Sequence, residues 1–240
     1  DDGHLMMHNS RFTQMGYWSG YFSVDGNRCD VQRAYGTRDK SWGVRPVGEP
    51  QGGAPGLLNG EPGVYWVWNP INFGDICTQF GTFEDRDGNP EQVSADLLPL
   101  YADPAQIPTG EDPGMVRMTA VEHKIDWVSG TRQAGPTSVS MQDKSGQRYD
   151  IKLEPLLRFY MLGIGYNHSE WGHAIWKGEL ETAREEWLLA EMDPLEYQHL
   201  HTHTVVRATM GERVGMGTLE TIVIGRHAPS GFQDFFDGAP

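Results

Sequence analysis

The stretch HLHTHTVVRATMGERVGMGTLETIVIG, residues 199–225, decides the fold class of this chain. Two extended runs, 199–210 and 216–225, lie on either side of Gly211-Glu212. A glycine-containing pair between two such runs is typical of a tight hairpin turn. The segment therefore predicts two antiparallel β-strands joined by that turn.

The same pattern of strands and turns recurs along the chain. Asp25-Gly26-Asn27 separates an aromatic-rich run, 17–24, from its return strand, 28–35, and the 30 glycines and 15 prolines are spread out as turn punctuation. Further strands are predicted at residues 65–68, 75–84, 92–98, 115–127, 137–142, 148–157, 158–165 and 174–187. Residues 180–192 alone have a helix-compatible composition, and we expect them to be mostly strand with a helical turn.

The predicted fold is all-β, because antiparallel strands joined by tight turns close into barrels or sandwiches. A barrel of about eight strands can hold one small ligand inside it or at its mouth. Residues 101–114, with several prolines and acids, have the composition of a linker. We therefore expect a first β-domain over residues 1–100 and a second over 115–240.

Composition excludes several classes of partner. The formal net charge is −14 at pH 7, and acids interrupt the densest basic run, 28–45, so we expect neither a nucleic-acid partner nor membrane insertion. The sequence contains no run of about 18 apolar residues, and from its first residues we expect no signal peptide. Only two cysteines, Cys29 and Cys77, are present, which suits a reducing compartment, so we expect a cytoplasmic protein with Cys77 as a buried thiol.

The first candidate site is Gly36-Thr37-Arg38-Asp39-Lys40-Ser41-Trp42-Gly43. A carboxylate beside an arginine and an aromatic wall is typical of a pocket mouth, where Asp39 would act as a general acid or base and Arg38 would bind an oxygen. Ser41 and Trp42 would contact the substrate, and the indole could stabilise a developing cation. The alternative is a structural Arg–Asp pair under a tryptophan that plugs a barrel end.

The second candidate site is Gly165-Tyr166-Asn167-His168-Ser169-Glu170-Trp171-Gly172-His173. Histidine titrates near neutrality, so His168 or His173 suits proton transfer, with Glu170 orienting a ring or carrying the proton. Tyr166 is a further catalytic candidate, and Trp171 is predicted to line the pocket. A hydrogen-bond network that fixes a loop is the alternative.

Two further sets of residues complete the candidates. Aromatic and amide side chains, which are the usual lining of a small-molecule pocket or of a β-core, gather at Trp66, Trp68, Asn72 and Phe73. His199, His201 and His203 would share one face of a strand, a pattern that fits either a zinc or iron site or an edge strand facing water. P-loop, dinucleotide-binding and Gly-x-Ser-x-Gly motifs are absent, which disfavours nucleotide chemistry and serine hydrolysis.

The Arg-Asp-x-Ser-Trp-Gly string at 38–43, Trp66-x-Trp68-x-x-x-Asn72-Phe73, and His-x-Glu-Trp-Gly-His at 168–173 carry a resemblance. Together with the tail from Gly215 to Phe232, they resemble the carotenoid 1,2-hydratase (hydroxyneurosporene synthase) and AttH-like superfamily, nearest to an uncharacterised bacterial branch. In that branch a histidine is common where this chain has Lys40, so no role of that histidine is carried over.

The resemblance covers most of the chain and implies two lipocalin-like β-barrel domains packed together, with a cavity near their interface. Because members of the family are typically longer at the N-terminus, we expect the first domain to be incomplete at its front. Characterised members act on hydrophobic small molecules, by hydrating isoprenoid double bonds or prenylated phenolics or by cyclisation.

Three functional hypotheses follow from these residues. The first is an acid–base enzyme of the lyase, hydratase or isomerase type that needs no cofactor and acts on a hydrophobic isoprenoid, aromatic or lipid-like molecule. The second is a lipocalin-like carrier of such a ligand, and the third is a metal enzyme that uses the three histidines of the strand 199–210. The expected partner is the small molecule itself, and a homodimer remains open.

Overall fold

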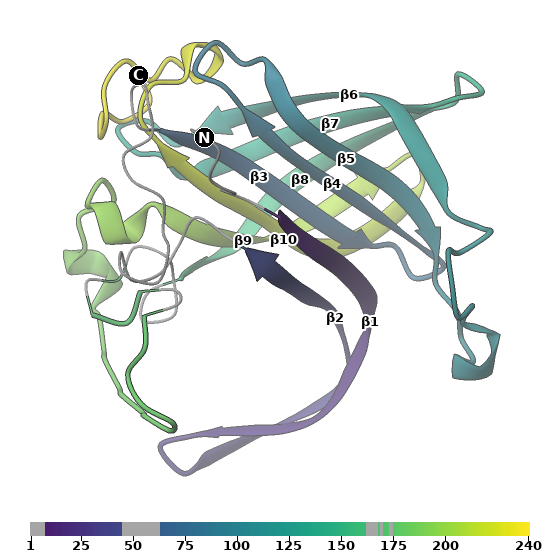
Figure 1. The fold of residues 1–240 in the computed structure, drawn as a ribbon, viewed down its shortest axis with the longest axis horizontal. Helices are drawn as coiled ribbons and strands as arrows, with labels where there is room; N and C mark the ends of the chain where they lie inside the picture. Colours follow the sequence, from purple (N-terminus) through teal and green to yellow (C-terminus); the bar gives the residue numbers. More distant parts are fainter. Residues whose placement is uncertain (1–7, 45–62, 162–167, 169, 173–174) are drawn as a thin grey trace.

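The computed structural model describes residues 8–44, 63–161, 168, 170–172 and 175–240. Eight antiparallel strands close into a barrel in the order β10-β3-β4-β5-β6-β7-β8-β9 (Figure 1). Their bounds are β3 Val64–Asn72, β4 Ile76–Glu84, β5 Pro90–Pro99, β6 Val116–Trp127, β7 Ala134–Asp143, β8 Arg148–Tyr160, β9 His201–Met210 and β10 Arg213–Ile224. The prediction of an all-β protein with a barrel is confirmed.

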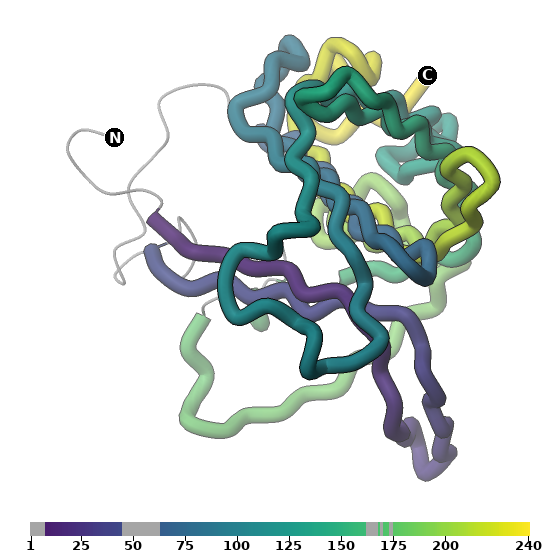
Figure 2. The backbone as a smooth tube through the Cα atoms, turned by 90° about the vertical axis from the view of Figure 1, so that its right-hand side faces the viewer, coloured from purple at the N-terminus to yellow at the C-terminus, as the bar shows by residue number. Residues whose placement is uncertain are grey.

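A separate two-stranded sheet precedes the barrel. It consists of β1 (His8–Val24) and β2 (Asn27–Val44), joined at Asp25-Gly26, where both residues have positive φ. Figure 1 shows this hairpin running along one side of the barrel and curving away towards its turn, and in the rotated view of Figure 2 the turn projects beyond the barrel. The sequence pattern predicted this turn, but β2 extends through Val44, so the Arg38–Trp42 motif lies on a strand.

The structure differs from the expected arrangement of two barrels. Within the described residues, the segment before β3 contributes two strands, and these form a two-stranded sheet. Residues 101–114, expected to separate two domains, connect β5 to β6 inside one barrel and contain the short 3-10 helix η2 (Pro104–Gln106). Strands β3–β5 therefore share a hydrogen-bonded sheet with β6–β10.

The core fills the inside of the barrel. Side chains alternate between the two faces of a strand, so Val67, Ile71, Val206 and Leu219 point inwards and are almost fully buried. The pairing of β3 with β10 closes the barrel, and β5 and β6, its most weakly joined neighbours, pair at Asp96–Arg117 and Leu97–Val116. No helix in the described part of the chain has the length and apolar character needed to cross a membrane.

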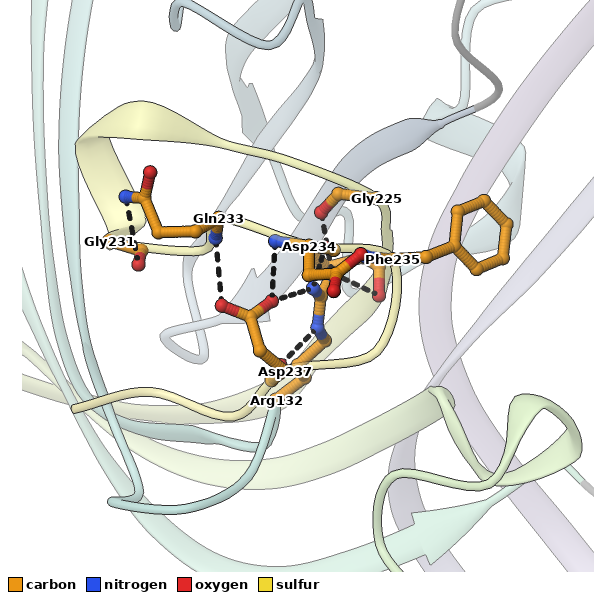
Figure 3. A network of polar contacts seen from close by, with 8 residues as sticks. Arg132, Gly225, Gly231, Gln233, Asp234, Phe235 and Asp237 are labelled. Carbon is orange, nitrogen blue, oxygen red and sulfur yellow. Dashed lines mark hydrogen bonds and ion pairs between the residues drawn. The ribbon is translucent and has the colours of Figure 1, made fainter.

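The segment after β10 covers one end of the barrel and is held there by Arg132 (Figure 3). Arg132 lies between β6 and β7, is 2% exposed, and stacks over the ring of Phe232 at 4.3 Å. Its guanidinium donates to the Asp237 carboxylate at 2.7 Å and to the carbonyl oxygens of Val223, Gly225, Asp234 and Asp237. One buried cation thereby holds the C-terminal segment against the barrel.

A second buried polar group lies at the same end of the barrel. His227 stacks on Tyr65 at 3.8 Å between ring centroids and bonds Glu84 through Nε2 at 3.2 Å. The Tyr65 hydroxyl lies 3.0 Å from Nε2 of His123, whose pKa is lowered by burial. His123 therefore faces the barrel interior.

Between β8 and β9 the described residues form no strand. Residues 180–192, expected to be mostly extended, contain only the 3-10 helix η3 (Leu189–Glu191), and η4 (Tyr197–His199) follows before β9. The run is rich in glutamate and finds no partner strand, so most of its side chains are exposed to solvent. Arg184 in this segment pairs with Asp25 at the tip of the hairpin.

Candidate functional site

One face of the β1–β2 hairpin is turned towards the barrel, and it carries the predicted Asp39. In the register of the hairpin, Thr13 lies opposite Asp39 and Arg11 lies opposite Ser41, so these side chains share a face. The Arg11 guanidinium lies 5.3 Å from the ring centroids of both Trp66 and Trp68 on β3. The Arg11 guanidinium therefore links the hairpin to the barrel through cation–π contacts with these two indoles.

Asp39 is held by its neighbours on the hairpin. Its Oδ1 accepts a hydrogen bond from Arg11 Nε at 2.8 Å and another from Thr13 Oγ1 at 3.0 Å. The side chains of Arg11 and Asp39 are 35% and 32% exposed, so solvent or a ligand can reach this pair. The arginine that pairs with Asp39 is thus Arg11 on the facing strand, and not the adjacent Arg38.

Trp66 and Trp68 lie on the outer face of the barrel, opposite to Val67 in the core. Gly81 on the neighbouring β4 leaves room for them, because a Cβ there would lie 3.4 Å from both indoles. Trp66 is 8% exposed and Trp68 is 4% exposed. The indole N–H of Trp68 is buried and has no hydrogen-bond partner among the described residues.

A cleft of about 570 Å³ opens beside this contact, between the hairpin and the connection from β5 to β6. Most of its lining is apolar, and its polar side chains include Thr13, Arg38, Tyr101 and Asp112. Its apolar lining comes from Met15, Tyr17, Trp18, Leu98, Pro99, Leu100, Ala102, Pro104, Ile107 and Pro108. The cleft has the size and the composition of a site for a hydrophobic small molecule with one or two polar groups.

The polar groups of the cleft are arranged as donors and acceptors. The Tyr101 hydroxyl donates to Asp112 Oδ1 at 2.9 Å, and this hydrogen bond raises the pKa of Tyr101, so the phenol stays protonated. Thr13 both lines the cleft and donates to Asp39, which places the Asp39 carboxylate one hydrogen bond from the cleft wall. Cys77 also borders the cleft, and burial raises the pKa of its thiol to about 12.

On the far side of Trp68, the outer face of the barrel carries two histidines and a glutamate. Glu220 on β10 lies opposite Trp68 on one side and His203 on the other. Its Oε1 lies 2.8 Å from Nε2 of His201 and 3.6 Å from Nε2 of His203. Burial by itself would raise the pKa of Glu220, but the hydrogen bonds from His201 and His203 outweigh it and hold the pKa well below its usual range.

Only two of the three predicted histidines belong to this cluster. His199 precedes β9, in η4, so the alternation that aligns His201 with His203 does not extend to it. Its Nδ1 contacts the carbonyl oxygen of Asp193 at 2.5 Å instead. Glu220 therefore takes the third place that the sequence gave to His199.

The second predicted motif is described in part, and the lining of the cleft includes none of its described residues. Tyr166 and His173 lie outside the described residues. His168 accepts at Nδ1 from the backbone N–H groups of Glu170 and Trp171, and its Nε2 lies 3.0 Å from Glu185. These contacts match a network that fixes a loop, the alternative to catalysis for this motif.

The other predicted residues divide between the site and the fold. Arg38 lines the cleft, whereas Trp42 packs against Phe12 and is 53% exposed, so it forms no wall of the cleft. Asn72 accepts from the backbone of Gly74 in the turn after β3, and Phe73 belongs to the barrel core. Ser41 lies opposite Arg11, whose guanidinium contacts the indoles of Trp66 and Trp68.

Sequence reasoning missed Arg11, Thr13, Tyr101, Asp112 and Glu220. A signal for Glu220 was present, since the predicted turn at Gly211-Glu212 fixes the register of the hairpin. Counting seven residues back from Met210 and seven forward from Arg213 reaches His203 and Glu220. For Arg11 no local signal exists, because its partners are indoles more than fifty residues away.

A closed eight-stranded barrel and a hairpin on its outer face, with a largely apolar cleft between the hairpin and the β5–β6 connection, define a lipocalin-like β-barrel protein. The chain belongs to a family of unknown function, DUF8625, whose model matches residues 1–233. A comparison with curated proteins found no match. Among solved structures, the chain is similar to the crystal structure of kievitone hydratase from Nectria haematococca, at 13% identity and a TM-score of 0.45. That likeness covers 90% of this chain and 53% of the other, so the chain spans about half the length of that structure.

Proposed function

We propose that the protein is an acid–base enzyme of the lyase type, which adds water to or removes it from a hydrophobic isoprenoid, aromatic or lipid-like molecule bound beneath the hairpin. The observation that carries this proposal is the position of Asp39, one hydrogen bond from the wall of a largely apolar cleft. The resemblance of the Arg38–Gly43 and Trp66–Phe73 motifs to a hydratase superfamily supports the same chemistry.

The cleft supplies binding and orientation. Burial of apolar ligand surface gives about 25 cal/mol per Å², and the cleft is lined mainly by aromatic and aliphatic side chains. Arg38 is placed to bind a substrate oxygen, since it lines the cleft and its guanidinium carries hydrogen-bond donors. A ligand of this kind would be oriented with its oxygen near Arg38 and its carbon skeleton along the apolar walls.

Asp39 supplies the base. Arg11 and Thr13 both donate to Oδ1, which leaves Oδ2 without a hydrogen-bond partner among the described residues. In hydration, Oδ2 takes one proton from the attacking water, whose oxygen bonds to one carbon of the double bond, while the second carbon takes a proton from solvent. Asp39 then returns its proton to solvent, and the reverse sequence releases water.

The test is turnover in a crude extract of hydrophobic metabolites, followed by untargeted mass spectrometry. The wild-type protein should consume one metabolite and produce another that differs by the mass of water. The Asp39→Asn variant should lose about 10²–10⁴-fold in rate, the usual contribution of a general base. Asp30→Asn is the matched control, because Asp30 lies on the same strand in an exposed pair with Arg28, and it should keep full activity.

Two outcomes would overturn the proposal. Full activity of the Asp39→Asn variant would show that this carboxylate is not the base. A ligand that co-purifies with the protein and is never converted would identify a carrier, and Arg38 and Asp39 would then be parts of its binding site.

A further inference from the structure

The cluster of His201, His203 and Glu220 presents three ligand atoms to one point on the outer face of the barrel. The relevant nitrogen and oxygen atoms all lie within 4.8 Å of one another. Glu220 Oε1 is the shared neighbour of both Nε2 atoms, at 2.8 Å and 3.6 Å. The three side chains come from two adjacent strands whose pairing is continuous through this region, so the backbone holds them in place.

The distances from Glu220 to the two histidines are close to the donor spacings of a tetrahedral metal site. A tetrahedral ion with bonds of about 2.0–2.2 Å separates neighbouring donors by about 3.3–3.6 Å. The distance from Glu220 to His203 already has this value, and the distance from Glu220 to His201 would lengthen by roughly half an ångström when an ion replaces the shared proton. The adjustment is within the reach of a glutamate side chain.

The charge state of the cluster also favours a cation. Glu220 is a carboxylate at neutral pH, and its partners among the described ion pairs are the two histidines. A divalent ion would neutralise this carboxylate, and the imidazole nitrogens beside it are the donors that such ions prefer.

We propose that His201, His203 and Glu220 form a binding site for one divalent transition-metal ion. Two imidazoles and one carboxylate leave coordination positions open, which is the pattern of catalytic zinc sites and of non-haem iron sites. The buried indole N–H of Trp68, the cross-strand neighbour of Glu220, lacks an acceptor among the described residues. An oxygen ligand at an open coordination position of the ion would supply an acceptor for this indole N–H.

This site differs from the one that the three-histidine pattern suggested, since it replaces His199 by Glu220. It also does not rest on the proposed lyase activity, because its groups are separate from Asp39 and from the lining of the cleft. Metal binding is therefore measured without substrate, and the Asp39→Asn variant should bind metal as the wild type does.

The experiment uses untagged full-length protein, stripped with a chelator and titrated with Co²⁺ and with Zn²⁺ alone. Visible absorption reports the coordination of Co²⁺, and calorimetry gives the stoichiometry and affinity of Zn²⁺. We expect one ion per chain in the wild type, and an affinity at least about tenfold weaker in the His203→Ala and Glu220→Gln variants. The matched control is His8→Ala, a histidine exposed at the start of β1, which should leave affinity unchanged.

His203→Ala keeps the test decisive, because the His203 side chain is 23% exposed and its removal should leave the fold intact, as circular dichroism will show. Absence of stoichiometric binding in the wild type would overturn the proposal. Equal affinity in the wild type and the folded His203→Ala variant would also overturn it. In either case the cluster would be a hydrogen-bonded network that stabilises the barrel wall.

Discussion

Replacing Arg132 by methionine should destabilise the protein more than any substitution of an exposed arginine. Methionine keeps much of the apolar stem that lies against Phe232 but removes all the donors that reach the C-terminal segment (Figure 3). The buried carbonyl oxygens that Arg132 satisfies would then have no partner. The C-terminal segment would lose its main polar attachment to the barrel end.

The expected cost can be worked out from these contacts. Removing one partner of a buried ion pair usually costs about 3–5 kcal/mol. Asp237 is 31% exposed and still accepts from the backbone N–H groups of Gln233 and Asp234, so water and these donors offset part of the loss. We therefore expect about 3 kcal/mol, at the lower end of the range.

The assay is urea unfolding at equilibrium, followed by tryptophan fluorescence and by circular dichroism. With a denaturant slope of about 3 kcal/mol per molar, the midpoint of the Arg132→Met variant should fall by about 1 M urea. Arg207→Met is the control, because its pair with Glu154 is 3.2 Å long and its side chain is 52% exposed, and its cost should be about 0–1 kcal/mol. Midpoints lowered equally in the two variants would refute the idea that Arg132 holds the barrel end.

Three further predictions concern the cleft and its surroundings. A thiol reagent should modify Cys29 rapidly and Cys77 only on unfolding, because Cys29 is exposed while Cys77 is buried and its thiol has a raised pKa. Rapid reaction of two thiols in the folded protein would contradict this. Gly81→Val should lower the free energy of unfolding by about 1–3 kcal/mol, since the valine methyl groups would push on Trp66 and Trp68, whereas Gly81→Ala should be nearly neutral. Thermal or urea unfolding measures both variants, and equal stability of the two would count against the close packing. Arg38→Met should weaken binding of an oxygen-containing ligand by about tenfold, as measured by calorimetry, without lowering stability; unchanged affinity would remove Arg38 from the binding site.

Local features of the fold were predictable because their causes are local. The turns at Asp25-Gly26 and Gly211-Glu212 are set by short-range backbone preferences, and both hairpins form where the sequence indicates them. The pairing of β3 with β10 is different, since it joins residues about 150 positions apart and no motif identifies the partner. Because the sequence does not reveal that pairing, the composition of the proline-rich stretch 101–114 indicated a domain boundary. In the structure this stretch connects the neighbouring strands β5 and β6.

The site was predictable to a similar degree. The composition of the 36–43 stretch pointed to Asp39 and Arg38 as candidates, because charged residues beside glycine and tryptophan are unusual on a plain surface strand; Arg38 lines the cleft and Asp39 lies one hydrogen bond from it, and their roles stay predictions. The same reasoning placed Trp42 in the pocket, but Trp42 packs against Phe12 and is exposed. Which face of an isolated hairpin meets the barrel depends on tertiary packing, and a single sequence does not encode that choice in its local pattern.

The closure of the barrel by β3 and β10 has a consequence for biosynthesis. A ribosome releases β3 early, but its hydrogen-bonding partner emerges only after most of the remaining chain has been made. Until then β3 presents an unsatisfied backbone edge, which is a template for intermolecular pairing. High contact order of this kind also slows folding, since a long loop must close before the last ladder forms. The nascent chain should therefore depend on chaperone protection until its C-terminal hairpin has been synthesised.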